Sequence, residues 1–326
     1  MDKIWNLPFV EFKPFEEIQE PRPLLLVTSG PAWDAVHDRL PQLPIQTRVD
    51  PLDATLAHWD ELLSGLKTES WQKELAVVYA VGGGLVADAA KYIALKLGLP
   101  LICLPTALSV DAFLTYASGI RRDGCVYYIE TKTPETLIVD LDVIANAPAY
   151  IRASGICDVL SIYTGLWDWK FADEQGENPP QMSYQPWVAQ AAGAILQGAL
   201  DCAEAAGSGD PDGLKQLLDC LAMEVQLCNQ AGHSRPEEGS EHYFAYLVEN
   251  YTGHGLPHGD LVGPGILIIS EKQGQAVDAV RRALLACHVP LDNIPPELVE
   301  KTLAELAPYS TKHGLPYGIA HTLPGN

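Results

Sequence analysis

The chain has 326 residues, 47% of them hydrophobic and 19% charged, a composition that excludes an intrinsically disordered protein. A formal net charge of −21 argues against nucleic acid as a partner, because phosphate backbones are bound by basic patches. No apolar run reaches about 18 residues and the first residues do not resemble a signal peptide, so we expect a cytoplasmic protein without a membrane span.

The first part of the chain alternates short apolar runs with amphipathic segments. We predict strands at 23–29, 44–50, 76–81 and 99–104, and helices at 32–40, 53–66 and 86–97. This alternation predicts a parallel sheet with helices on both faces. A β-hairpin around the charged turn 121–124 and a short buried strand at 137–140 follow.

Strand patterns nearly vanish after Pro148, and helical patterns replace them at 149–171, 187–206, 213–231, 238–252, 259–271 and 275–287. Glycine- and proline-rich loops are expected at 176–180 and 207–213. We therefore predict an α/β domain at 1–147 and an all-α domain at 148–326. The seven cysteines include no CxxC pair and lie mostly in apolar runs, which indicates reduced core thiols.

Three glycines, Gly82, Gly83 and Gly84, separate the strand at 76–81 from the next helix. A glycine turn lets backbone N–H groups approach a phosphate at a helix N-terminus. The segment lacks the full GxGxxG pattern, so an ordinary βα turn is the alternative.

A polar loop, residues 105–111, follows the strand at 99–104, where open α/β sheets bind their ligands. Thr106 and Ser109 offer hydroxyls to a cofactor, and Asp111 offers a carboxylate to a substrate hydroxyl. The alternative is a capped loop, because all three residue types form turns. At the end of the strand at 44–50, Asp50 favours the ribose of NAD, whereas Arg48 would favour the 2′-phosphate of NADP.

Two histidines and one aspartate are candidate ligands of a divalent metal. His242 and His258 lie 16 residues apart around a glycine- and proline-bearing turn, so an αα-hairpin would bring their imidazoles together. Asp158 lies in an apolar helical stretch, where an unpaired charge is costly. Two histidines with a carboxylate leave an open metal position, and they suit zinc, nickel or iron. A helix-capping aspartate and surface histidines are the alternatives.

Four motifs in this order resemble the superfamily of iron-containing alcohol dehydrogenases and dehydroquinate synthases, and within it the glycerol-1-phosphate dehydrogenases. The motifs are GGGLVADAAK, LPTALSVDAF, GICDVLSIYTGLWDW and HSRPEEGSEH followed by HGD. The resemblance implies a Rossmann-like N-terminal domain, a helical metal- and substrate-binding domain, an active site in the cleft between them, and a homo-oligomer. It assigns the metal to Asp158, His242 and His258.

The resemblance also assigns the pyrophosphate to the glycine turn, and it adds Asp88 and Thr115 to the cofactor site. It implies a metal-dependent, NAD(P)-linked reduction of a small and phosphorylated ketone, dihydroxyacetone phosphate, to sn-glycerol 1-phosphate. His254 is a candidate proton relay and Arg235 a candidate phosphate ligand; a surface histidine and a salt-bridged arginine are the alternatives.

Other readings of the same fold remain open: a polyol dehydrogenase with an unphosphorylated substrate, a cyclase of the dehydroquinate synthase kind, and a non-catalytic relative. The DAAK continuation of the glycine turn speaks against the cyclase. Ile162 stands where longer relatives carry a fourth histidine ligand, and Glu237 and Glu238 place negative charge near the expected phosphate.

Overall fold

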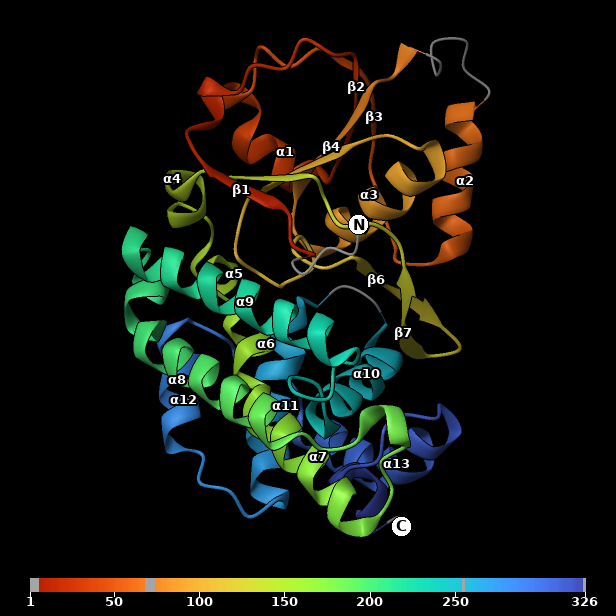
Figure 1. Ribbon diagram of the computed structural model, residues 1–326, viewed down its shortest axis with the longest axis vertical. Helices are drawn as coiled ribbons and strands as arrows, with labels where there is room; N and C mark the ends of the chain where they lie inside the picture. Colours follow the sequence, from red (N-terminus) through yellow and green to blue (C-terminus); the bar gives the residue numbers. More distant parts are fainter. Residues whose placement is uncertain (1–5, 68–73, 254–255, 325–326) are drawn as a thin grey trace. The chain divides into compact units, whose positions relative to one another are not determined.

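A computed structural model describes residues 6–67, 74–253 and 256–324 of the chain (Figure 1). The chain divides into two compact units, Met1–Ala147 and Pro148–Asn326. Each unit is described separately below.

The first unit is built on a six-stranded sheet with the order β1-β8-β5-β4-β2-β3, in which every neighbouring pair is parallel. Its strands are β1 Phe9–Phe12, β2 Leu24–Thr28, β3 Ile45–Val49, β4 Val77–Gly82, β5 Leu101–Pro105 and β8 Thr136–Val139. Its helices are α1 Gly30–Val36, α2 Leu56–Lys67, α3 Gly84–Leu97 and α4 Leu141–Ala145, with short 3-10 helices at η1 Phe15–Glu17 and η2 His37–Arg39. The predicted α/β fold class of this half is confirmed.

The central strands of this sheet are apolar along their whole length, as expected of strands covered on both faces. All five residues of β2 and all six of β4 are buried. The chain runs from β2 outward to β3 and then crosses back to β4 on the other side of β2. Such a reversal of strand order creates the crevice in which open α/β sheets bind ligands, at the carboxyl ends of the strands.

The predicted hairpin is present as a separate antiparallel pair, β6 Ala117–Arg122 and β7 Cys125–Glu130. The sequence did not predict β1, whose four residues lie between Pro8 and Pro14. Prolines mark strand ends and edge strands, and β1 lies at the edge of the sheet, where it pairs with β8.

A fully buried lysine, Lys91 on α3, organises the chain that follows β5. Its ammonium group forms an ion pair with Asp88 (2.9 Å) and donates hydrogen bonds to the carbonyls of Ala112 (2.8 Å) and Ala117. The other oxygen of Asp88 accepts from the Gly119 N–H at 3.2 Å. The Asp88–Lys91 pair therefore binds the backbone of the loop after β5 and of the start of β6 to α3.

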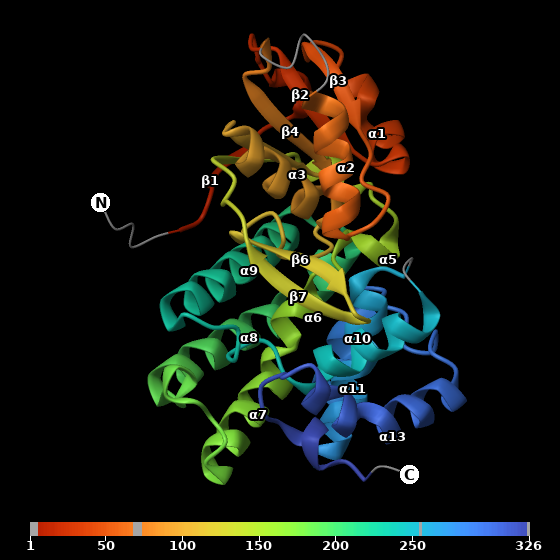
Figure 2. The same ribbon diagram turned by 90° about the vertical axis from the view of Figure 1, so that its right-hand side faces the viewer.

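The second unit is all-helical, as predicted, and Figure 2 shows its helices in green to blue. They are α5 Ala149–Arg152, α6 Ile156–Leu160, α7 Ile162–Gln175, α8 Pro186–Ser208, α9 Pro211–Ala231, α10 Ser240–Thr252, α11 His258–Lys272, α12 Asp278–Ala286 and α13 Pro296–Lys312, with 3-10 helices at η4 Pro180–Met182 and η5 Ile319–Thr322. The long helices α8 and α9 lie side by side in both views.

The helix predicted at 149–171 is three helices instead of one. Serine hydroxyls interrupt it, since Ser154 and Ser161 donate to carbonyls three residues earlier, at 3.4 and 2.5 Å. The loop predicted at 207–213 is shorter than expected, because α8 continues to Ser208 and α9 begins at Pro211.

The helix α13 was missed because Pro295, Pro296 and Pro308 resemble loop punctuation, although proline is favoured at the first position of a helix. All seven cysteines are free, as expected of core thiols. Within the described ranges, no helix combines the length and the apolar character needed to cross a lipid bilayer.

The buried ion pair on α3 gives the first prediction. Lys91→Met should lower the free energy of unfolding by about 3 kcal/mol, because it leaves Asp88 and three backbone carbonyls without their cationic partner. Urea denaturation measures this loss.

Lys96→Met is the matched control for that experiment. Lys96 lies on the same helix but is exposed, and its ammonium group lies over the face of Tyr92 in a cation–π geometry. Its replacement should cost less than about 1 kcal/mol. Equal losses in the two variants would contradict the role given to Lys91.

Candidate metal centre and nucleotide-binding edge

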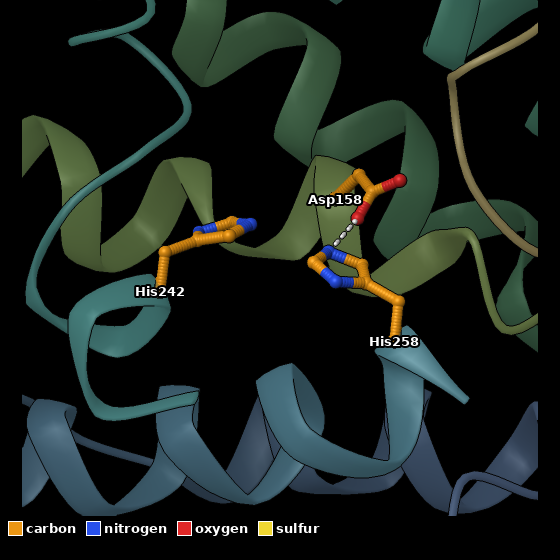
Figure 3. Close-up of side chains that lie close together, drawn as sticks. All are labelled: Asp158, His242 and His258. Atoms are coloured by element: carbon orange, nitrogen blue, oxygen red, sulfur yellow. Dashed lines mark ion pairs between the residues drawn. The ribbon is translucent and has the colours of Figure 1, made fainter. Parts of the chain in front are cut away.

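Three side chains of the second unit converge as candidate metal ligands (Figure 3). Asp158 lies in α6, His242 is the third residue of α10, and His258 is the first residue of α11. One ligand atom from each lies within 4.8 Å of the others. Asp158 Oδ1 is 3.1 Å from His258 Nε2, and the two imidazole centroids are 5.3 Å apart. The predicted grouping of these residues is therefore present, and their role as ligands stays a proposal.

Glycines bring the helices that carry these residues close together. A Cβ atom at Gly259, next to His258, would lie 3.0 Å from the Cβ of Ser154 just before α6. The Cys157 thiol contacts the Gly259 carbonyl at 3.7 Å. On the other side of α11, a Cβ at Gly265 would lie 2.9 Å from the Glu241 carbonyl. The position of His258 thus depends on close contact of α11 with α6 and with α10.

The imidazole of His242 is bound by the neighbouring carboxylate. Glu241 Oε1 lies 2.8 Å from His242 Nδ1, and it also accepts from the Gly239 N–H at 2.7 Å. Burial lowers the pKa of His242, but the hydrogen bond and charge of Glu241, with charges on Glu238 and Asp158, raise it to about 9.

The donor set fits a divalent metal. One carboxylate and two imidazoles are ligands of catalytic zinc sites, which keep a fourth position open for water or substrate. A ligating imidazole almost always donates its other N–H to a carboxylate or carbonyl, and Glu241 occupies that place for His242. Asp158, His242 and His258 are therefore the residues that would hold the ion.

A second buried carboxylate, Asp168 on α7, holds the segment before His242. Asp168 Oδ2 accepts from the Ser240 N–H (2.7 Å) and the Ser240 hydroxyl (2.5 Å), and Oδ1 accepts from Ile319 N–H (2.8 Å) and the Gln273 amide (3.0 Å). Burial raises the pKa of this carboxyl, although the hydrogen bonds from Ile319 and Ser240 oppose the shift. Asp168 thereby ties the start of α10 to α11 and to the C-terminal segment.

Neither Glu241 nor Asp168 was predicted as a functional residue, although the sequence contains a signal for each. Asp168 is a lone acid in the apolar stretch LWDWKFA, the same pattern that singled out Asp158. Glu241 directly precedes a candidate ligand. Side chains of adjacent residues inside a helix do not face each other. In the first turn of α10, however, the carboxylate of Glu241 reaches the imidazole of His242.

The remaining predicted residues of this unit lie in different environments. Arg235 has 1% of its surface exposed and donates to the Tyr317 carbonyl at 2.8 Å, so its guanidinium already anchors the C-terminal segment. Its contact with a substrate phosphate stays a prediction. His254 lies outside the described residues. Ile162 is buried in the core, and Glu238 accepts from Ser234 (2.9 Å) and Tyr246 (2.6 Å).

In the first unit, the glycine turn and the polar loop lie together at the carboxyl edge of the sheet. Gly82 pairs with Pro105, and the Thr106 N–H donates to the Gly82 carbonyl at 3.3 Å. A Cβ at Gly83 would lie 3.2 Å from the Ser109 hydroxyl. A side chain at Gly84 would collide with Val110, 2.8 Å away. The loop thus packs directly on the glycine turn, which begins α3.

The other predicted cofactor residues have structural contacts of their own. Asp50 follows β3 and accepts from the Gly30 N–H at the start of α1 (3.1 Å), and Arg48 lies 4.0 Å from it. Asp88 is bound to Lys91 and Gly119, as described above. The Thr115 hydroxyl accepts from the Ala117 N–H at 3.2 Å. Leu114 N–H donates to the carbonyl of Asp111 at 2.7 Å. Their roles toward a cofactor or substrate stay predictions.

Comparison with known proteins places the chain in a family. The family described as iron-containing alcohol dehydrogenase matches residues 19–148. A glycerol-1-phosphate dehydrogenase (NAD(P)+) of Methanothermobacter thermautotrophicus is 31% identical over 270 residues, which cover 79% of this chain and 72% of the relative. The chain belongs to the iron-containing alcohol dehydrogenase family.

Two further comparisons extend along most of this alcohol dehydrogenase. A Sulfurisphaera tokodaii protein, also named glycerol-1-phosphate dehydrogenase (NAD(P)+), is 28% identical over 288 residues, covering 86% of this chain and 80% of the relative. The crystal structure of a probable glycerol dehydrogenase from Sinorhizobium meliloti 1021 superimposes with a TM-score of 0.71, covering 99% and 93% of the two chains at 17% identity. This structural likeness supports the fold. Members of the family are NAD(P)-dependent, metal-containing alcohol dehydrogenases, so the predicted enzyme class is confirmed.

The contacts of Asp168 lead to a second prediction. Asp168→Asn should lower the free energy of unfolding by about 3 kcal/mol. Both oxygens of Asp168 accept hydrogen bonds, and asparagine replaces one of them by an N–H₂ group that would face the N–H or O–H donors of Ser240 or Ile319. Asp173→Asn on the same helix is the control, since Asp173 is exposed. If urea denaturation gives the two variants the same stability, Asp168 does not hold the start of α10.

Proposed function

We propose that this alcohol dehydrogenase reduces dihydroxyacetone phosphate to sn-glycerol 1-phosphate with a reduced nicotinamide nucleotide, at a zinc centre held by Asp158, His242 and His258. The convergence of one carboxylate and two imidazoles carries the proposal for the metal centre. The substrate rests on relatives named glycerol-1-phosphate dehydrogenase, of which the first two are covered by this chain over 80% and 81% of their length.

The bound ion would polarise the ketone carbonyl as a Lewis acid, while the nicotinamide supplies the hydride. The chain itself supplies the ligands and their orientation. Asp158 brings one negative charge to the ion, and His242 and His258 bring neutral donors, so the centre keeps net positive charge for a carbonyl oxygen. Glu241 and Asp168 hold the start of α10, which carries His242.

The first unit supplies the nucleotide-binding edge in this proposal. Gly83 and Gly84 let the pyrophosphate approach the N-terminus of α3, where unpaired N–H groups and the helix dipole favour an anion. Thr106, Ser109 and Thr115 contribute hydroxyls beside the nicotinamide, and Asp111 contacts the substrate. Asp50 accepts from the adenosine ribose, so NAD is preferred over NADP.

A second candidate substrate is an unphosphorylated ketone or polyol. The observation that favours it is an acidic charge near the candidate metal ligands. The carboxylate of Glu238 accepts a hydrogen bond from the hydroxyl of Tyr246, one turn beyond His242 on α10. Its negative charge contributes to the raised pKa of His242. Such a carboxylate repels a phosphate and accepts hydrogen bonds from hydroxyl groups.

Removal of one proposed ligand gives the third prediction. His258→Ala should lower bound zinc from one ion per chain to near zero, and ketone reduction should fall to the background rate with it, because two ligands hold the ion poorly. Metal analysis by mass spectrometry and NADH oxidation measure the two effects.

His288→Asn is the control for this ligand variant. His288 is exposed and has a left-handed backbone (φ 57°), which asparagine tolerates. The His288→Asn variant should keep the zinc content and the rate of ketone reduction of the wild type. Full activity of a zinc-free His258→Ala variant would contradict the proposed centre.

The choice of substrate gives the fourth prediction. The kcat/KM for dihydroxyacetone phosphate should exceed that for dihydroxyacetone at least about tenfold, because one charge-assisted hydrogen bond to a phosphate contributes about 1.5–3 kcal/mol. Steady-state kinetics of the zinc-loaded chain with both ketones decides this. A preference for dihydroxyacetone would replace the phosphorylated substrate by the polyol candidate and leave the metal centre intact.

A further inference from the structure

We propose that Glu241 is a positioning residue of the metal centre: its carboxylate holds His242 with Nδ1 as the hydrogen-bond donor, so that Nε2 is presented to the ion. The inference rests on the proposed function, because it takes His242 as a ligand. It adds a residue that does not touch the metal and acts only through the imidazole.

The hydrogen bond decides which ring nitrogen is available. Glu241 Oε1 lies 2.8 Å from His242 Nδ1. An ionised carboxylate only accepts hydrogen bonds, so Nδ1 is the donor in this contact, and Nε2 is the nitrogen whose lone pair binds the ion once the ion displaces its proton. Figure 3 shows one ring nitrogen of His242 directed toward Asp158 and His258. The nitrogen left free by Glu241 is therefore available to the ion.

Glu241 is itself fixed, which a positioning residue requires. Its side chain is fully buried, and the same Oε1 accepts from the Gly239 N–H at 2.7 Å. Gly239 has an extended backbone (φ −146°, ψ −149°), and a Cβ at this position would lie 3.0 Å from Glu241 Oε2. A side chain at this position would crowd the Glu241 carboxylate, which turns back toward Gly239 and His242.

The carboxylate of Asp168 holds the residue between Gly239 and Glu241. It binds both the N–H and the hydroxyl of Ser240, and the Ser240 hydroxyl in turn accepts from the Ala320 N–H at 3.0 Å. Residues 239–241 are thus held by the carboxylates of Asp168 and Glu241. This rigidity would keep the imidazole in one orientation, as outer hydrogen bonds do in other metal sites.

A purely structural role is the competing explanation, because a glutamate in the first turn also stabilises a helix by accepting from its free N–H groups. The two roles differ in their effect on zinc affinity. A structural cap changes thermal stability alone, whereas a positioning residue changes the affinity of a protein that is still folded.

Four variants of the full chain, stripped of metal, separate these roles by competition for zinc with a chromophoric chelator. Glu241→Ala and Glu241→Met both remove the acceptor, and methionine keeps the volume of the buried side chain. Glu241→Gln keeps the acceptor, and its N–H₂ group can take the place of Oε2, which has no hydrogen-bond partner among the described residues. Glu249→Gln, eight residues or about 12 Å further along α10 than Glu241, is the matched loss of charge.

We expect Glu241→Ala and Glu241→Met to lower the zinc affinity by about 10- to 100-fold. Glu241→Gln should recover most of that loss, and Glu249→Gln should leave the affinity within about twofold of wild type. In NMR spectra of the zinc-loaded chain, the slowly exchanging imidazole N–H proton of His242 should be present in wild type and Glu241→Gln. It should be lost in Glu241→Met.

Wild-type zinc affinity in a folded Glu241→Ala or Glu241→Met variant would overturn the inference and leave the proposed function standing. Equal losses in Glu241→Met and Glu249→Gln would also overturn it, because charge alone would then explain the effect. If the wild-type chain binds no zinc or other divalent ion, the proposed function fails together with the inference.

Discussion

The cost of burying a carboxylate without partners shapes the second unit. Asp158, Asp168 and Glu241 all lie in its interior, where an isolated charge would be expensive. Asp168 accepts hydrogen bonds through both oxygens, Glu241 accepts through Oε1 from the Gly239 N–H, and Asp158 faces His258. The polar interactions that keep these acids in the core are the same ones that orient two imidazoles and a carboxylate toward one point.

In the first unit, close approach of the backbone shapes the edge of the sheet where the glycine turn lies. A side chain at Gly84 would collide with Val110, a Cβ at Gly83 would crowd the Ser109 hydroxyl, and the polar loop after β5 packs directly on both glycines. Lys91 fastens the continuation of that loop by donating to backbone carbonyls. The N-terminus of α3 therefore lies in a fixed environment, which suits a pyrophosphate whose position decides where a nicotinamide reacts.

Much of this organisation was predictable from local sequence. The alternation of apolar runs predicted the parallel sheet, and the loss of strand patterns after Pro148 predicted the helical unit. Asp158, His242 and His258 were found because buried charge and histidine spacing are visible along the chain. Asp168 and Glu241 were missed because their partners, at Ser240, Ile319 and His242, are set by tertiary contacts. The contact of Arg235 with the Tyr317 carbonyl was missed for the same reason, because the two residues are far apart in the sequence.

The central claim is that Asp158, His242 and His258 hold one divalent ion. Anomalous diffraction from crystals of the chain grown with zinc, recorded on both sides of the zinc absorption edge, tests it most directly. The account predicts one strong peak, about 2.0–2.2 Å from an oxygen of Asp158 and from His242 Nε2 and a His258 ring nitrogen. A zinc peak elsewhere in the chain, with none among these three side chains, would contradict it.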